Sequence, residues 1–322
     1  MLKITCQGAS RDFWDEIKSS GNWAGLGNIE FSNQNFDDSD VHFVFDYIGS
    51  DSALLGRKNV MVIFEPRTVN PFQYSRKNLD KFDLIVPVGE IRARSLGLSD
   101  YINCPIKFLP AEKNIKDREL DFVLLNANKF SANPNSLYGV RRKFSRYLFS
   151  SHQSYALYGL DWKMPKRKEL RERLWAIRKE IKSLSKPDLK EALSDFLYRY
   201  PEYKGSPIDK QDALRLAKFA VIVENEADYI SEKIFDAIFS GCVPLYVGPD
   251  LNCFETLNRC AVQIGSDTKN LKDFIENYSE ELYQDKISNI FEAINDSDNF
   301  STFSFKKNSE KLITIVRSKF NL

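Results

Sequence analysis

The chain has 322 residues, of which 43% are hydrophobic and 28% charged, and its net charge is +1. This length is enough for two domains of about 150 residues each, and the composition is typical of a soluble globular protein. The small net charge argues against a global field that would attract nucleic acid or an anionic membrane, and no nucleic acid partner is expected.

The five cysteines are an odd number without CxxC spacing, and the two histidines, His42 and His152, are isolated. These features argue against a disulfide framework and against a metal site, so reduced, mostly buried thiols are expected. The first residues lack the layout of a signal peptide. No apolar run reaches the roughly 18 residues that cross a bilayer. We therefore expect a cytoplasmic protein without a transmembrane segment.

Short apolar runs recur along the chain, and many end at turn residues. Several are continuously apolar, which is typical of strands covered on both faces. Helical patterns lie between them, for example Ser231–Ser240 and Leu271–Ile294. This alternation predicts parallel α/β sheets. The predicted strands are Leu2–Cys6, Val41–Ile48, Val60–Phe64, Leu84–Val88, Phe122–Leu125, Tyr155–Tyr158, Phe219–Val223, Pro244–Val247 and Ala261–Ile264.

A polar stretch, Ala111–Leu120, separates the first four predicted strands from the rest and is interpreted as a linker. The predicted fold is therefore α/β with two Rossmann-like domains, residues 1–115 and 116–300. Residues 301–322 are expected to form a helix that packs back toward the first domain.

Glu169–Leu184 has apolar residues at helical spacing in a segment rich in Lys and Arg. One interpretation is a helix that contacts a membrane surface or a partner. The other is an amphipathic helix that packs on the domain and exposes a basic face to solvent. The interleaved glutamates favour the second interpretation, and the wider segment 163–203 is left without a predicted role.

The stretch Phe219–Pro249 has the pattern of a strand, a polar loop, a helix and a second strand. The first strand ends at Val223. The helix begins with Asp228 or Ser231 as its N-cap. Gly241 stands where a left-handed residue ends a helix. The loop thus lies at the carboxyl end of a strand, where open α/β sheets bind their ligands.

The residues that open this helix suit a nucleotide diphosphate. A helix N-terminus offers unpaired N–H groups and the positive end of the helix dipole, and Lys233 adds a full positive charge. Glu232 is placed to accept hydrogen bonds from two ribose hydroxyls. An acidic first turn also favours the helix dipole by itself, but the combination indicates phosphate binding.

The same segment resembles the signature of the family 10 glycosyltransferases, the α-1,3/1,4-fucosyltransferases. The parts that match in order and spacing are Glu224-Asn225, Tyr229-Ile-Ser-Glu-Lys233 and Gly241-Cys-Val-Pro-Leu245. The resemblance implies that Tyr229, Glu232 and Lys233 contact the nucleotide and diphosphate of GDP-fucose. It also places Glu224 and Asn225 in the donor site.

Two further segments extend the resemblance. Asn133–Phe144 is similar to the family segment whose arginine reaches the diphosphate, which places that role on Arg141, with Arg142 as the alternative. A guanidinium suits this role because it engages two phosphate oxygens at once. A surface arginine on a helix is the structural alternative.

Met61–Phe72 is similar to the strand whose glutamate acts as the catalytic base of the family, which places that role on Glu65. A strand-end carboxylate that faces a cleft is expected to have the raised pKa that a base needs. The structural alternative is an ion pair with Arg67 or Arg76.

The resemblance implies an inverting glycosyltransferase of GT-B architecture, with two Rossmann-like domains facing a cleft. The first domain would bind an oligosaccharide or glycoconjugate acceptor, through loops within Gly8–Ser32 and Asn70–Asn78, and the second would bind the GDP-sugar donor. Glu65 would take the proton from an acceptor hydroxyl while L-fucose leaves GDP. Because cationic side chains would stabilise the diphosphate, no cofactor or metal is required. Peripheral contact with the inner membrane surface is a further expectation.

Alternatives remain open. Members of the family often continue Glu-Asn with Ser or Thr, whereas this chain has Glu226-Ala-Asp228 beside the expected sugar pocket. Another nucleotide-linked sugar, or a non-catalytic glycan-binding relative, is therefore also considered. Glu224 and Glu232 have the Glu-x7-Glu spacing of retaining GT-B enzymes, but Asn225 replaces the usual glycine. The two Asp-x-Asp sequences that a metal-dependent GT-A enzyme would use fit turns or helix ends better; they are Asp38-Ser-Asp40 and Asp296-Ser-Asp298.

Overall fold

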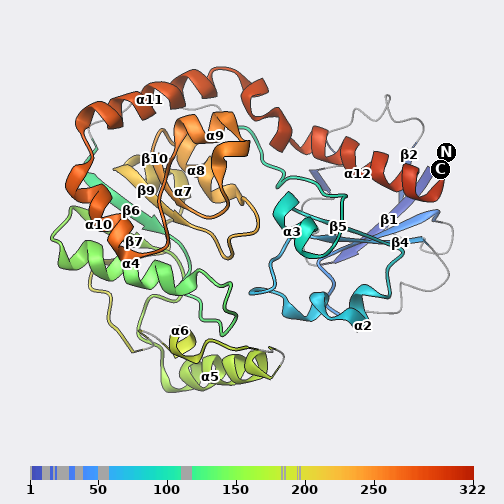
Figure 1. Ribbon diagram of the computed structural model, residues 1–322, viewed down its shortest axis with the longest axis horizontal. Coiled ribbons are helices and arrows are strands. Elements are labelled where there is room, and N and C mark those ends of the chain that lie inside the picture. Colours follow the sequence, from blue (N-terminus) through green and yellow to red (C-terminus); the bar gives the residue numbers. More distant parts are fainter. Residues whose placement is uncertain are drawn as a thin grey trace. The chain divides into compact units, whose positions relative to one another are not determined.

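The computed structural model describes residues 2–8, 15–16, 19, 29–32, 39–49, 58–109, 118–182, 184, 186–193, 195 and 197–322 (Figure 1). By its internal contacts the chain divides into two compact units. The first unit contains Met1–Lys107, Asp228–Ile230 and Phe300–Leu322, and the second contains Phe108–Ala227 and Ser231–Asn299.

The predicted linker falls largely on residues 110–117, which lie outside the described residues. The predicted domain boundary at residue 115 therefore stays a prediction. Most of the expected acceptor loop Gly8–Ser32 and the Asp38 position also lie outside the described residues. In the other Asp-x-Asp sequence, the Asp296 carboxylate accepts a hydrogen bond from the Asp298 backbone N–H, as in a turn at a helix end.

The first unit is built on a parallel sheet with the strand order β2-β1-β3-β4-β5. This is the order of flavodoxin-like doubly wound sheets. β3 is buried along its whole length, as expected for a strand covered on both faces. The elements are β1 (Leu2–Gly8), β2 (Ile29–Ser32), β3 (Val41–Phe45), β4 (Lys58–Ile63), η3 (Pro71–Tyr74), α2 (Arg76–Leu79), β5 (Leu84–Pro87), α3 (Glu90–Ser95) and α12 (Phe305–Phe320).

Helix α12 lies in the first unit although it is the last element of the chain. Its apolar stripe, Leu312, Ile313 and Val316, is buried in the same core as Val86 of β5. Ser304 caps its N-terminus by accepting a hydrogen bond from the Lys307 N–H. The last residues of the chain thus complete the first unit's core.

The second unit is built on a parallel sheet with the order β11-β10-β9-β6-β7-β8. Counted from β6, this is the 3-2-1-4-5-6 order of the Rossmann fold, and the strand order reverses between β6 and β9. The strands are β6 (Leu120–Leu125), β7 (Tyr155–Tyr158), β8 (Tyr203–Gly205), β9 (Ala217–Val223), β10 (Val243–Val247) and β11 (Val262–Gln263).

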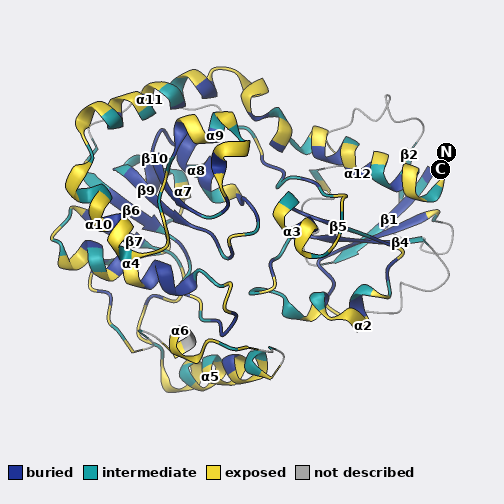
Figure 2. Ribbon diagram, in the orientation of Figure 1, coloured by how far each residue is buried: buried dark blue, intermediate teal, exposed yellow. Residues whose placement is uncertain are grey.

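The helices of the second unit follow the strands in the expected alternation, and Figure 2 shows the exposed residues on their outward faces. The helices are α4 (Tyr138–Ser150), α5 (Arg167–Ile181), α6 (Leu189–Leu193), α7 (Lys210–Arg215), α8 (Glu232–Phe239), η4 (Leu251–Cys253), α9 (Glu255–Cys260), α10 (Thr268–Asn277), α11 (Glu280–Ile294) and η5 (Ser297–Phe303, grouped in part with the first unit).

The predicted fold class is confirmed, because both sheets are parallel and doubly wound. All nine predicted strands are present, and β2 and β8 are additional. The pattern Leu271–Ile294 was interpreted as one helix, and this is wrong. The helix breaks between α10 and α11, where Ser279 caps the second helix through the Leu282 N–H.

Helix α5 covers most of the basic amphipathic pattern. Its Ile177 is buried against Ala132, and Ile181 and Leu184 pack beside them. The packed interpretation therefore holds for this stripe. The outward face presents Trp175, which is 66% exposed and lies under the ammonium of Lys179.

None of the described helices is both long enough and apolar enough to cross a membrane. The cytoplasmic location stays a prediction. Of the five cysteines, Cys242 and Cys260 are buried and Cys253 is exposed. Burial raises the pKa of the Cys242 thiol to about 12, so this thiol stays protonated and unreactive at neutral pH.

Gly159, at the carboxyl end of β7, has a φ of +127°. A Cβ at this position would lie 2.1 Å from the Asn126 carbonyl oxygen. We expect Gly159→Ala to lower the free energy of unfolding by at least about 2 kcal/mol, because strain and a backbone clash add. Urea denaturation measures the loss. Gly205→Ala is the matched control, since its φ is +98° but nothing lies within 4 Å. An equal loss in both variants would show that the clash contributes nothing.

Candidate functional site

The strand β9, the loop after it and helix α8 adopt the predicted arrangement. β9 is buried from Phe219 to its end at Val223. Ser231 is the N-cap of α8, and its side chain accepts a hydrogen bond from the Lys233 N–H. Gly241 has a φ of +64°, which confirms the left-handed residue after the helix. Asp228 is not the N-cap, because its carboxylate is bound elsewhere.

Glu224 is fully buried behind the N-terminus of α8. Its carboxylate accepts hydrogen bonds from the N–H and hydroxyl of Ser231, at 2.9 and 2.6 Å. It also accepts from the ammonium of Lys233 at 3.3 Å and the hydroxyl of Tyr246 at 3.2 Å. Glu224 thereby fixes the start of α8 and the direction of Lys233. Its predicted contact with the donor stays a prediction.

Arg141, on α4, is buried and bridges the ends of two strands at the switch point. Its guanidinium donates to the Val223 carbonyl after β9, at 2.9 and 3.2 Å, and to the Ala127 carbonyl after β6, at 3.2 Å. It also donates to the Asn225 side chain at 2.7 Å. The predicted arginine therefore lies at the carboxyl edge of the sheet and orders the backbone there, together with Asn225.

Arg142 points differently from its neighbour. It is buried, donates to the Lys129 carbonyl at 2.7 Å and stacks on the ring of Phe130. The structure thus gives Arg141 the contacts at the strand ends, and Arg142 holds the loop after β6.

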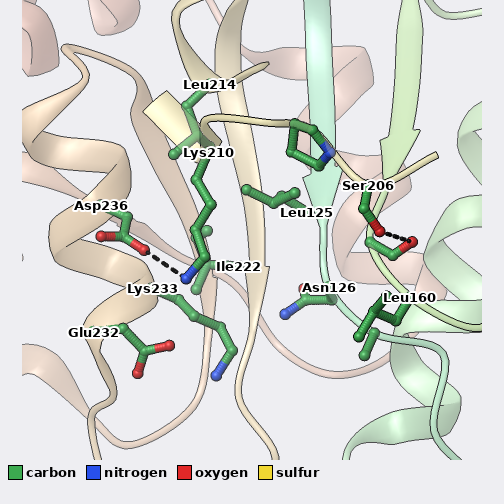
Figure 3. Close-up of a pocket in the computed structure, with 13 residues that line it drawn as sticks. Leu125, Asn126, Leu160, Ser206, Lys210, Leu214, Ile222, Glu232, Lys233 and Asp236 are labelled. Carbon is green, nitrogen blue, oxygen red and sulfur yellow. Dashed lines mark hydrogen bonds and ion pairs between the residues drawn. The ribbon is translucent and has the colours of Figure 1, made fainter. Parts of the chain in front are cut away.

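A pocket of about 370 Å³ opens at the carboxyl ends of the second sheet's strands. Its lining comes from residues that follow β6, β7 and β8, from the end of β9, and from helices α7 and α8. Figure 3 shows the charged residues of the two helices on one side and Asn126, Leu160 and Ser206 on the other. This is the crevice in which doubly wound sheets bind nucleotides.

Glu232 and Lys233 bring the predicted chemistry into this pocket. Exclusion of water by the surrounding protein works to raise the pKa of Glu232, but Lys233 and Lys210 outweigh it and hold that pKa below its ordinary value. Loss of hydration works to lower the pKa of Lys233, but Glu224 and Glu232 raise it above its ordinary value. Both groups are therefore charged at neutral pH. Arg141 is near enough to affect both pKa values.

Tyr229 belongs to the first unit and is only 8% exposed. The guanidinium carbon of Arg92 lies 4.2 Å from the centre of the Tyr229 ring, and Arg92 is fully buried. Arg92 also binds both carboxylate oxygens of Asp228, each at 2.9 Å, and the Phe64 carbonyl at 2.7 Å. The structure shows Tyr229 as a core residue of the first unit. Its predicted contact with a donor stays a prediction.

We expect Arg92→Lys to lower the free energy of unfolding by about 3 kcal/mol, because one ammonium cannot replace the two-pronged contact with Asp228 and the stacking on Tyr229. Chemical denaturation checks the value. Arg94→Lys in the same helix is the matched control, because its side chain is 75% exposed. A loss in Arg92→Lys no larger than in the control would contradict a structural role for this cluster.

Glu65 lies two residues after the end of β4 in the first unit, and it is half-buried. Its backbone is held firmly. Asp46 accepts hydrogen bonds from the N–H groups of Phe64 and Glu65, at 2.9 and 2.8 Å. Gln73 and Tyr74 both donate to the Glu65 carbonyl at 2.9 Å. The role of Glu65 as the base stays a prediction. Its backbone is held by hydrogen bonds on both sides, which would fix the position of a base.

Two residues of the pocket, and two residues with structural roles in the first unit, were missed from the sequence. Lys210 and Asp236 line the pocket, and Asp236 stands one helical turn after Glu232, a spacing that was available as a signal. The buried contacts of Arg92 and Asp46 had no such signal, because both act through the backbone or through residues far away in the sequence.

The two doubly wound units are similar to those of glycosyltransferases with the GT-B fold. A glycosyltransferase from Rickettsia africae has 11% identical residues and a TM-score of 0.55, with 99% of this chain and 98% of that chain covered. HepE from Anabaena, solved with UDP and glucose, has 11% identity and a TM-score of 0.56 over 99% and 100% of the two chains. An α-glucosyltransferase solved with UDP has 9% identity and a TM-score of 0.57 over 98% and 100%. No protein-family model and no curated protein matches the sequence.

Proposed function

We propose that the chain is an inverting glycosyltransferase that transfers L-fucose from GDP-fucose to a hydroxyl of a glycan acceptor. The observation that carries the proposal is the pocket at the switch point of the second sheet, with Glu232 and Lys233 at the N-terminus of α8 in its wall. A carboxylate for ribose hydroxyls and a cation at a helix N-terminus suit a nucleoside diphosphate.

The choice of GDP-fucose follows from the sequence signature around the same pocket. Two of the three residues that depart from the family pattern, Glu226 and Asp228, have side-chain partners within this chain. Glu226 is buried and accepts a hydrogen bond from Asn133 at 3.1 Å, and Asp228 is paired with Arg92. Both side chains therefore have packing partners within the chain, and the choice of fucose rests on the matching parts of the signature.

The proposed reaction is a single displacement at the anomeric carbon. Glu65 accepts the proton of the attacking hydroxyl. Lys233, the N–H groups that open α8, and Arg141 stabilise the charge that develops on the departing diphosphate. The protein's cations supply this stabilisation, so the scheme uses no metal ion.

The competing donor is a UDP-sugar, since HepE and the α-glucosyltransferase were solved with UDP. A donor screen that measures nucleotide release, with and without an acceptor panel, separates the two. We expect turnover with GDP-fucose and a product of inverted anomeric configuration. Turnover with UDP-glucose and none with GDP-fucose would overturn the donor assignment. Glycan binding without turnover of any donor would identify a non-catalytic relative.

A further inference from the structure

Two charged residues of the pocket wall have no role in the reaction described above. Asp236 lies on α8 one turn after Glu232, and Lys210 opens α7. The Lys210 ammonium lies 3.6 Å from an Asp236 carboxylate oxygen, and the two side chains are 60% and 26% exposed. Figure 3 shows this pair beside Glu232 and Lys233 on the same side of the pocket.

A third polar group lines the pocket from the other side. Asn126 follows β6 and is 4% exposed, and neither its amide oxygen nor its amide nitrogen has a hydrogen-bond partner among the described residues. A buried amide without partners is costly.

The order of groups along α8 indicates which part of a nucleotide reaches Asp236. The phosphates belong at the helix N-terminus, and the ribose hydroxyls at Glu232. Four residues of α-helix advance about 6 Å, which is the step from the ribose to the far edge of the base. Asp236 and Lys210 thus stand where the base presents its polar edge.

Guanine is the base that fits this pair. Its edge carries two adjacent N–H donors, at N1 and the 2-amino group, followed by the O6 acceptor. A carboxylate accepts two parallel N–H bonds, and an ammonium beside it donates to the oxygen. Uracil presents one N–H between two oxygens, and adenine presents one donor beside an acceptor nitrogen. We infer that Asp236 and Lys210 form a subsite that selects guanine over other bases, an inference that rests on the proposed nucleotide-sugar function.

The electrostatics of Asp236 agree with this role. Burial raises the pKa of Asp236 to about 6, with Glu232 acting in the same direction and Lys210 and Lys233 opposing it. At pH 7.5 the group is an ionised but poorly hydrated carboxylate. Two N–H donors on a ligand supply the hydrogen bonds that water gives to an exposed carboxylate. Their contribution to binding affinity is therefore larger than at an exposed site.

The test compares nucleotides that differ only at the edge of the base. Titration calorimetry at pH 7.5 measures the Kd of GDP, IDP, XDP and UDP for the full chain and for Asp236→Asn. IDP lacks the 2-amino group, and XDP carries an oxygen there. We expect the wild type to bind GDP at least about 10-fold more tightly than IDP. In Asp236→Asn the GDP affinity should fall about 10-fold to 100-fold, and the preference over IDP should vanish.

The test also includes an expected gain of affinity for one nucleotide, because damage to the fold would lower the affinity for every nucleotide. An amide in place of the carboxylate donates to the 2-oxygen of XDP, so Asp236→Asn should bind XDP more tightly than the wild type does. Asp212→Asn makes the same change on α7, at a side chain that is 74% exposed and outside the pocket, and should leave all four affinities unchanged.

The outcomes separate this inference from the proposed function. If the wild type prefers GDP over UDP, but Asp236→Asn keeps its preference for GDP over IDP and gains nothing with XDP, the subsite is wrong and the GDP-sugar function stands. If the wild type binds UDP more tightly than GDP, the proposed donor and the subsite both fail.

Discussion

Replacement of Glu65 by glutamine is expected to abolish transfer and to leave GDP binding nearly unchanged. The glutamine keeps the shape of the side chain but cannot take a proton, and loss of a general base lowers the rate about 10²-fold to 10⁴-fold. The backbone should not move, because Asp46, Gln73 and Tyr74 hold both sides of the Glu65 peptide. The effect should therefore appear in kcat at saturating donor.

The measurement is transfer from the donor that turns over, together with the Kd of GDP. Glu90→Gln on α3 is a matched control, because this glutamate lies in the same unit and its side chain is 40% exposed. If transfer persists at the wild-type rate in Glu65→Gln, another residue acts as the base. If GDP binding falls with transfer, the substitution has disturbed the fold.

The second large effect is expected at Lys233. We expect Lys233→Ala to weaken GDP binding by about 10-fold to 100-fold, because a cation at the start of α8 is lost from the diphosphate. The Lys233 side chain is only 19% exposed and donates to Glu224 and Ser231, so its ammonium is oriented before a ligand arrives. The loss should be smaller at high salt, where the wild-type affinity itself is screened.

The same substitution leaves the buried Glu224 carboxylate without this ion pair, so stability must be followed by thermal unfolding. Guanosine separates the two effects, because it has the base and ribose but no phosphate. Its affinity should be unchanged in Lys233→Ala, and an equal loss for guanosine and GDP would remove Lys233 from the diphosphate. Lys272→Ala on α10, exposed and outside the pocket lining, is the control for loss of one charge.

The strands were predictable because most of them are continuous apolar runs that end at turn residues. β2 and β8 escaped because neither is a continuous apolar run: β2 has the sequence Ile-Glu-Phe-Ser and β8 has Tyr-Lys-Gly. No residue of β8 is fully buried, so it has no apolar run to detect. The break between α10 and α11 was missed because the apolar residues of both helices follow one helical period. The two residues between the helices, Tyr278 and Ser279, do not interrupt that period.

The pocket of the second unit was predictable only as far as its lining lies in one stretch of chain. The pattern from β9 to α8 located Glu232 and Lys233 correctly in a pocket. It did not reveal that Glu224 supports the helix from behind, because that role depends on Tyr246 in the next strand. The partnership of Lys210 with Asp236 depends on how α7 packs beside α8, which no local pattern encodes.

Three residues in the middle of the stretch Phe219–Pro249, Asp228–Ile230, belong to the first unit, while the residues on both sides belong to the second. Exchange of a whole unit between related chains cannot therefore use one cut in the sequence. A first unit taken from a relative needs that relative's own three residues and its own C-terminal helix. Without them, the residue equivalent to Arg92 would lose the contacts that Arg92 makes here with Asp228 and Tyr229. The first unit and these three residues are therefore expected to vary together among relatives.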